Sequence, residues 1–255
     1  MFNIWWGILF VIVNYGLFTL CYRLFGIKGM YAWIGVATVL ANVQVIKTIE
    51  LFGVVTTLGN TMYVSMYLAS DLLNEKFGPK VARKAIWFGF FTLIMTTIIM
   101  QMVLEFDAYG VDGMSEAQSA LITIFGQLPR LMVASLSAYL ISQFLDVRLY
   151  TWLRQLFPAP HQLWIRNNGS TMISSFVDTL VFCSIAFLGV YEWQVWIEIF
   201  LTTYILKFVL TAAGTPFLYI ARGMKVAEED KPLMISYQIA KEKEAEAETQ
   251  EVAKP

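Results

Sequence analysis

Histidine and cysteine are almost absent from this 255-residue chain. The one histidine, His161, lies in a polar segment and cannot by itself make a zinc site, which needs about four ligands. The two cysteines, Cys21 and Cys183, both fall in apolar segments and define no disulfide framework. The sequence also lacks a GxxxxGK(S/T) phosphate loop, an HExxH motif and a GxSxG motif. We therefore expect no enzyme, no bound metal or cofactor, and no ATPase on this chain.

Charged residues are scarce as well, at 15% of the chain against about 25% in soluble proteins. Hydrophobic residues make up 58%, above the ~45–50% of soluble domains, and the mean hydropathy is +0.61. Because the apolar residues fall in long blocks, the sequence predicts a polytopic protein of the lipid bilayer. The net charge of −1 argues against nucleic acid as a partner.

A helix needs about 20 mainly apolar residues to cross the hydrocarbon core. Seven segments meet or nearly meet this requirement: 3–22, 29–47, 54–73, 85–104, 122–145, 169–191 and 195–221. The fifth is interrupted at Gly126, Pro129 and Arg130, so its first part is read either as membrane-spanning or as a separate re-entrant or surface helix. The predicted fold is an all-α polytopic membrane protein, a bundle of six to seven transmembrane helices.

The sequence predicts two regions of different character. Residues 1–225 hold all the apolar segments and are expected to form the transmembrane domain. The first apolar stretch runs to about Tyr22, which is too long for the apolar part of a signal peptide, so we expect it to be retained. Residues 226–255 alternate Lys, Glu and Ala and predict a charged cytoplasmic tail, either a solvated helix or disordered.

The distribution of cations predicts the orientation. Of the 18 Lys and Arg residues, 15 fall in alternate connecting segments or the tail. They are Arg23, Lys28, Lys76, Lys80, Arg83, Lys84, Arg148, Arg154, Arg166, Arg222, Lys225, Lys231, Lys241, Lys243 and Lys254. The segment 105–118 instead holds four carboxylates and no cation. Since cytoplasmic loops carry the excess of Lys and Arg, the N-terminus is expected outside and the C-terminus inside.

Polar residues within the apolar segments predict a buried site. At 1.5 Å per residue, Asp178, Lys207, Arg130 and Asn42 each lie roughly 18–24 Å from the inner edge, on four different helices. A charge inside the membrane is costly and usually faces the bundle interior. A site for a small polar solute accounts for all four. Two simpler readings stay open: Asp178 and Lys207 form a structural salt bridge, and Arg130, like Lys47, extends to the outer interface.

Several polar segments together carry a family resemblance. They are ANVQVIK at 41–47, DLLNEKFG at 71–78, Arg130 with ASLSAYLISQ at 134–143, Asp146 with Val147, LWIRNNGST at 163–171, Asp178 with Thr179, and Lys207 with Thr215 and Pro216. This set resembles the queuosine precursor transporter family, also called a vitamin uptake transporter family. The resemblance covers about residues 30–225.

The resemblance implies a multi-pass transporter of the bacterial inner membrane that imports 7-deazaguanine precursors of queuosine, such as 7-cyano-7-deazaguanine and 7-aminomethyl-7-deazaguanine. It also implies a fold like that of the substrate-binding subunits of energy-coupling-factor transporters, without a dedicated ATPase. The alternative is a substrate-capture subunit of an energy-coupling-factor vitamin transporter, which needs a separate energising module. Self-association into a homo-oligomer stays open.

A deazaguanine gives the predicted site its chemistry. Its donor edge, a ring N–H and an amine, suits the carboxylate of Asp178. Asn42 or Gln44 is expected to read the carbonyl, and aromatic faces to stack on the ring. Lys207 is expected to pair with Asp178 in the empty site or to bind the carbonyl in the filled one. Arg130 completes the predicted set of binding residues.

The cation pattern generates the first prediction. A reporter fused to the C-terminus should be active in the cytoplasm, because the part of the chain after the last apolar segment carries six of the clustered cations. Paired alkaline phosphatase and green fluorescent protein fusions measure this directly. A C-terminal phosphatase that is active while the fluorescent fusion is dark would reverse the orientation.

Overall fold

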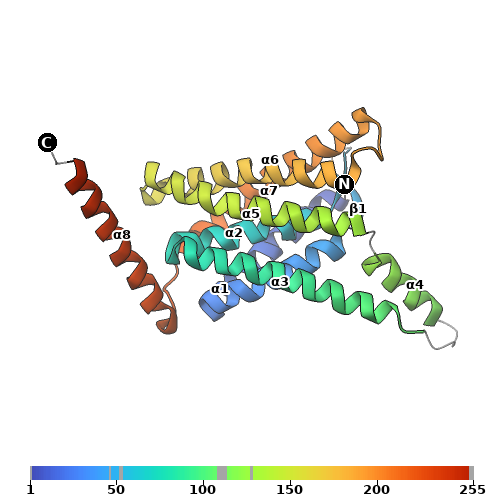
Figure 1. Cartoon of the computed structure of the whole chain (residues 1–255), viewed down its shortest axis with the longest axis horizontal. Helices are drawn as coiled ribbons and strands as arrows, with labels where there is room; N and C mark the ends of the chain where they lie inside the picture. Colours follow the sequence, from blue (N-terminus) through green and yellow to red (C-terminus); the bar gives the residue numbers. More distant parts are fainter. Residues whose placement is uncertain (1, 46, 52–53, 108–113, 127–128, 253–255) are drawn as a thin grey trace.

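The computed structural model describes residues 2–45, 47–51, 54–107, 114–126 and 129–252. These residues form eight α-helices and one two-stranded hairpin (Figure 1). In chain order the elements are α1 (Phe2–Gln44), β1 (Thr48–Leu51), β2 (Val54–Thr57), α2 (Gly59–Phe77), α3 (Pro79–Leu104), α4 (Met114–Phe125), α5 (Pro129–Leu156), α6 (Leu163–Phe187), α7 (Trp193–Gly223) and α8 (Lys231–Val252). The helical class predicted from composition is therefore correct.

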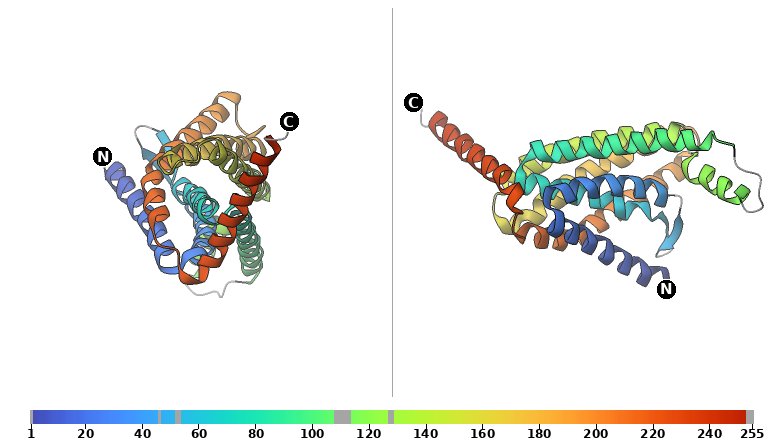
Figure 2. Two further views of the ribbon diagram at one scale, coloured as in Figure 1. Left: turned by 90° about the vertical axis from the view of Figure 1, so that its left-hand side faces the viewer. Right: turned by 90° about the horizontal axis from the view of Figure 1, so that it is seen from below.

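Helix α1 contains the first predicted segment, and the second as far as Gln44, and bends sharply at Gly26. The backbone there has φ +54°, a left-handed conformation that glycine adopts without strain. A Cβ at Gly26 would overlap the carboxylate of Asp230, which accepts a 2.9 Å hydrogen bond from the Ile27 N–H. The two halves of α1 consequently run in opposite directions (Figure 2).

Four helical segments of the described chain are long and apolar enough to cross a membrane: α1, α3, 160–187 (which contains α6) and α7. They contain all or most of five of the seven segments predicted from the sequence. The third and fifth segments correspond to α2 and α5, which are long but carry more polar residues.

One predicted boundary is wrong. Residues 54–57, placed in the third helical segment, instead pair with β1 in an antiparallel hairpin, with Thr57 opposite Thr48. Their Val-Val-Thr-Thr sequence is β-branched throughout and favours a strand. The fifth segment, 122–145, is divided at the predicted interruption: α4 ends at Phe125 and α5 begins at Pro129, a residue well suited to the first helical position.

Helix α2 is the centre of the bundle. Every one of its residues except Tyr63 and Lys76 is buried, and the end-on view shows the other helices around it (Figure 2). Asp71, Asn74 and Glu75, in the last part of α2, are therefore interior residues. A helix enclosed by protein needs no lipid-facing apolar surface, which explains its polar composition.

One buried carboxylate joins four helices at the end of the bundle where α7 ends. Glu75 Oε1 on α2 accepts from Arg166 of α6 at 2.8 Å and from Arg222 of α7 at 2.9 Å. Its Oε2 accepts from the Tyr150 hydroxyl of α5 at 2.9 Å and lies 3.5 Å from Arg154 Nε. Arg166 is fully buried. Arginines from several cationic connecting segments thus meet at one end of the bundle. This is expected, because every second connection between antiparallel helices lies at the same end.

The charged tail forms helix α8, which points away from the bundle (Figure 1). Its first part is attached to the same end. Glu229 pairs with Lys28 at 2.7 Å, and the Tyr237 hydroxyl accepts from Arg154 at 2.9 Å. The start of α1 lies at the opposite end of the bundle (Figure 2).

Removing the shared carboxylate should destabilise the bundle strongly. In Glu75→Ala the fully buried Arg166 keeps its charge without a partner, and breaking a buried pair in this way costs about 3–5 kcal/mol. Glu229→Ala is the matched control, because its pairing with Lys28 is exposed and should matter little. Thermal unfolding of the detergent-solubilised protein measures both. Equal melting temperatures for the two variants would contradict the central role of Glu75.

Candidate functional site

A buried ion pair lies inside the other half of the bundle. Asp178 on α6 and Lys207 on α7 face each other, with Lys207 Nζ 2.5 Å from Asp178 Oδ2. Their residues are only 3% and 5% exposed. Both side chains come from helices that are otherwise apolar enough to span a membrane, so their charges have to be directed inward.

Neighbouring side chains complete the coordination of this pair. Asp178 Oδ1 accepts from the Tyr63 hydroxyl at 2.5 Å and from the Ser142 hydroxyl at 3.0 Å. Lys207 also donates to Thr179 Oγ1 at 3.2 Å, and its ammonium lies 4.9 Å from the centre of the Tyr63 ring. These contacts hold the carboxylate with charge-assisted hydrogen bonds from three helices.

The ion pair forms part of the wall of a cavity of about 570 Å³. This volume lies within the ~300–1,000 Å³ range of small-molecule sites. Polar lining residues from α1, α2, α4, α5, α6 and α7 are Thr38, Asn42, Asn60, Thr123, Ser135, Asp178, Thr203 and Lys207. Aromatic lining residues are Tyr63, Tyr139, Phe182 and Phe187. The cavity therefore offers flat apolar faces beside a small number of hydrogen-bonding groups.

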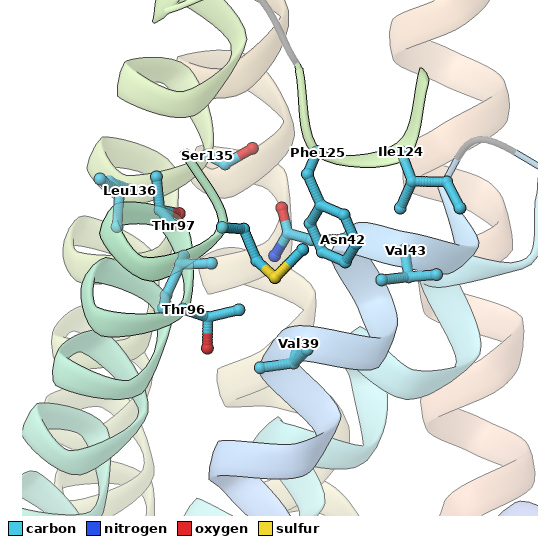
Figure 3. Close-up of a pocket in the computed structure, with 11 residues that line it drawn as sticks. Val39, Asn42, Val43, Thr96, Thr97, Ile124, Phe125, Ser135 and Leu136 are labelled. Carbon is cyan, nitrogen blue, oxygen red and sulfur yellow. The ribbon is translucent and has the colours of Figure 1, made fainter. Parts of the chain in front are cut away.

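A smaller pocket of about 50 Å³ adjoins this cavity (Figure 3). It is lined by Val39, Asn42 and Val43 of α1, Thr96 and Thr97 of α3, Ile124 and Phe125 of α4, and Ser135 and Leu136 of α5. Asn42 and Ser135 line both spaces, so they mark where the two meet. Helix α4 is fixed beside this pocket by Gln101 Nε2, which donates to the Phe125 carbonyl at 2.6 Å.

Three of the five predicted binding residues come together in the structure: Asp178, Lys207 and Asn42 all line the cavity. Gln44 is half-buried near the end of α1 and is not among the cavity's lining residues in the described chain. The side chain of Arg130 lies outside the described part of the structure. Lys47 is exposed beyond the end of α1, which fits its reading as an interfacial residue.

Tyr63 and Ser142 both bind Asp178 but are not among the binding residues predicted from the sequence. A signal for Tyr63 exists in the spacing of α2: Tyr63, Tyr67, Asp71 and Glu75 recur every four residues and so share one helix face. For Ser142 there is no comparable signal, since small hydroxyl residues commonly bond to their own helix backbone.

A bundle of long apolar helices around a cavity with a buried ion pair defines a polytopic membrane protein that can hold a polar solute within the bilayer. Comparison with known proteins gives the particular family. The family described as "Putative vitamin uptake transporter" matches residues 57–221, and the chain belongs to it.

Three curated relatives carry a more specific name. A "Probable queuosine precursor transporter" of Bacillus subtilis (strain 168) is 48% identical over 224 residues, 88% of this chain and 96% of that protein. The "Queuosine precursor transporter" of Escherichia coli (strain K12) is 28% identical over 67% of this chain and 74% of its own length. A "Probable queuosine precursor transporter" of Haemophilus influenzae is 31% identical over 52% of each chain. No solved structure gives a significant match.

The ion pair generates a stability prediction. Asp178→Asn should lower the melting temperature of the purified protein, because Lys207 is left buried without its counter-ion, at a cost of about 3–5 kcal/mol. The double variant Asp178→Asn/Lys207→Met should regain most of this loss, since both charges are then gone. A double variant as unstable as the single one would mean that Asp178 stabilises the bundle through Tyr63 and Ser142, not through Lys207.

Proposed function

We propose that this protein imports queuosine precursors, small 7-deazaguanines, across a bacterial inner membrane. The observation that carries the proposal is the 48% identity with the Bacillus subtilis protein over 96% of that protein's length. The aligned part makes up 88% of this chain. The cavity itself supports the proposal by its size and by its mixture of aromatic and polar walls.

In the proposed complex, Asp178 accepts hydrogen bonds from the donor edge of the deazaguanine. A carboxylate can accept from two adjacent N–H groups at once. Lys207, which pairs with Asp178 in the empty site, then binds the ligand carbonyl. Tyr63 lies against both charged groups and offers a ring face for stacking. Arg130 and Gln44 remain predicted binding residues on the basis of the sequence.

Asn42 is placed to assist Lys207 at the carbonyl. Its amide nitrogen donates one hydrogen bond to the Thr38 backbone carbonyl at 2.8 Å. A primary amide has a second N–H, so one donor is left for a ligand in the cavity.

The proposed topology has seven crossings: the two halves of α1, then α2, α3, α5, α6 and α7. Helix α4 packs beside α3 at the end of the bundle and does not cross. An odd number of crossings agrees with the start of α1 and helix α8 lying at opposite ends (Figure 1). With the cationic end inside, the N-terminus is periplasmic and the tail cytoplasmic. A fold like the substrate-binding subunits of energy-coupling-factor transporters is part of this proposal.

Uptake of a labelled substrate tests the function. A strain that can neither make nor import queuosine precursors should accumulate labelled 7-aminomethyl-7-deazaguanine when it expresses this chain. Unlabelled 7-cyano-7-deazaguanine should compete and guanine should not. Equal competition by guanine would refute the proposed specificity. Uptake that requires separate ATPase subunits would instead make the chain a capture subunit.

The same assay tests the site. The charge-free double variant Asp178→Asn/Lys207→Met serves here, because it is expected to fold. If the pair binds substrate, this variant should lose at least about ten- to hundredfold in apparent affinity, the effect of losing a hydrogen bond to a charged group. Normal uptake by the folded double variant would reduce the pair to a structural salt bridge.

A further inference from the structure

Three helices contribute a continuous line of buried polar side chains between the cavity and the cationic end. We name it the polar column. Its members are Tyr63, Tyr67, Asp71 and Glu75 on α2, Ser142, Asp146 and Tyr150 on α5, and Arg166, Ser170, Ser174 and Asp178 on α6. On each helix they recur every four residues, which places successive members on one face about 6 Å apart. All of them except Tyr63 are buried.

Two carboxyl groups meet in the middle of the polar column. Asp71 of α2 and Asp146 of α5 are both 0% exposed and lie within hydrogen-bonding reach of each other. We name them the acid pair. Asp146 Oδ1 accepts from the Ser174 hydroxyl at 2.8 Å, and the buried hydroxyl of Thr171 also faces Asp146. Among the described residues, neither oxygen of Asp71 nor Oδ2 of Asp146 has a hydrogen-bond partner.

Nearby cations do not neutralise the acid pair. Arg166 is the cation that acts on Asp71, but its guanidinium is bound to Glu75 at 2.8 Å, and Glu75 itself repels Asp71. Arg222 and Arg154 are likewise directed to Glu75.

The other titratable groups around the acid pair are neutral phenols. They are Tyr67 beside Asp146 and Tyr150 beside Asp71, and the Tyr150 hydroxyl donates to Glu75. In the described part of the chain, the acid pair makes no salt bridge.

Two ionised carboxylates in contact, away from water and without a salt bridge to a cation, are strongly unfavourable. One bound proton removes the repulsion, because the protonated group becomes a donor and the ionised group its acceptor. The geometry of two carboxyl groups within hydrogen-bonding reach is the geometry that such a shared proton requires.

The acid pair is also connected to the ion pair in the cavity. Ser142 donates to Asp178 and lies one helical turn from Asp146 on α5. Ser174 donates to Asp146 and lies one turn from Asp178 on α6. Helix α5 therefore carries Asp146 and a hydroxyl donor to Asp178, and helix α6 carries Asp178 and a hydroxyl donor to Asp146. A shift of α6 relative to α5 on substrate binding would change both sets of contacts together.

We propose that Asp71 and Asp146 share one exchangeable proton and that this acid pair couples import to the proton gradient. The inference rests on the proposed function and deepens it by naming the coupling ion. In the step itself, the protonated carboxyl loses H⁺ toward the cationic end and becomes a carboxylate. A proton from the cavity side then restores the acid, so charge and atoms balance over one cycle.

Infrared spectroscopy of the purified protein tests the shared proton without any substrate. The wild-type protein should keep a protonated carboxyl C=O band at neutral pH, and raising the pH should remove it. Asp71→Asn and Asp146→Asn should each lack this band, because the remaining carboxylate accepts from the new amide. Glu198→Gln, which changes an exposed carboxyl on α7, is the control and should keep the band. A wild-type spectrum without the band would overturn the proposal.

Proteoliposomes test the coupling. An inward proton gradient should make the wild-type protein accumulate 7-aminomethyl-7-deazaguanine at least about tenfold above equilibration, with proton entry reported by a trapped pH dye. Asp146→Asn should accumulate none, yet exchange labelled for unlabelled substrate at a rate within about threefold of wild type, since the amide resembles the protonated acid. Glu198→Gln should behave as wild type.

The outcomes separate the two proposals. Wild-type protein that exchanges the deazaguanine but ignores the proton gradient, or responds only to a sodium gradient, would overturn proton coupling alone. Accumulation driven by the proton gradient in Asp71→Asn and Asp146→Asn would also overturn proton coupling alone. Failure of the wild-type protein to exchange any deazaguanine would refute the proposed substrate. The infrared measurement would still test the shared proton, because it needs no substrate.

Discussion

A charge inside a helical membrane bundle has to be paired, and in this protein one carboxylate meets that requirement for three arginines. Glu75 comes from α2, the central helix, and its partners come from α5, α6 and α7. A fully buried guanidinium such as that of Arg166 is tolerated only where such a partner is fixed. The arrangement of α5, α6 and α7 around α2 therefore depends on this single group.

The same constraint operates at two further levels of the bundle. In the cavity, Asp178 pairs with Lys207 and accepts from hydroxyl groups. The acid pair makes no salt bridge within the described part of the chain, so a shared proton would relieve its repulsion. The three levels differ in how their carboxylates are compensated. The order is physically reasonable for a transporter. The Glu75 cluster is fixed at one end, the acid pair with its proposed exchangeable proton lies in the middle, and the ion pair of Asp178 and Lys207 is open to the cavity.

The position of α2 also explains why composition describes this fold incompletely. Apolarity identifies helices that face lipid, and α1, α3, α6 and α7 satisfy it. Helix α2 faces protein on every side, so Asp71, Asn74 and Glu75 are tolerated at its core. Helix α2, which contributes Asp71 and Glu75 to the polar column, is thus not among the helices that hydropathy identifies.

The sequence alone determined the membrane class, the helical segments, the break between Gly126 and Pro129, and the similar depth of Asp178, Lys207 and Asn42. Length, apolarity and rise per residue suffice for these properties because each belongs to a single helix. Only the tertiary structure decided that Tyr63 and Ser142 bind Asp178, that Asn42 and not Gln44 lines the cavity, that residues 54–57 form a strand, and that Asp71 meets Asp146. Those contacts depend on how each helix is rotated against its neighbours, and this rotation is set by side-chain packing across the whole bundle.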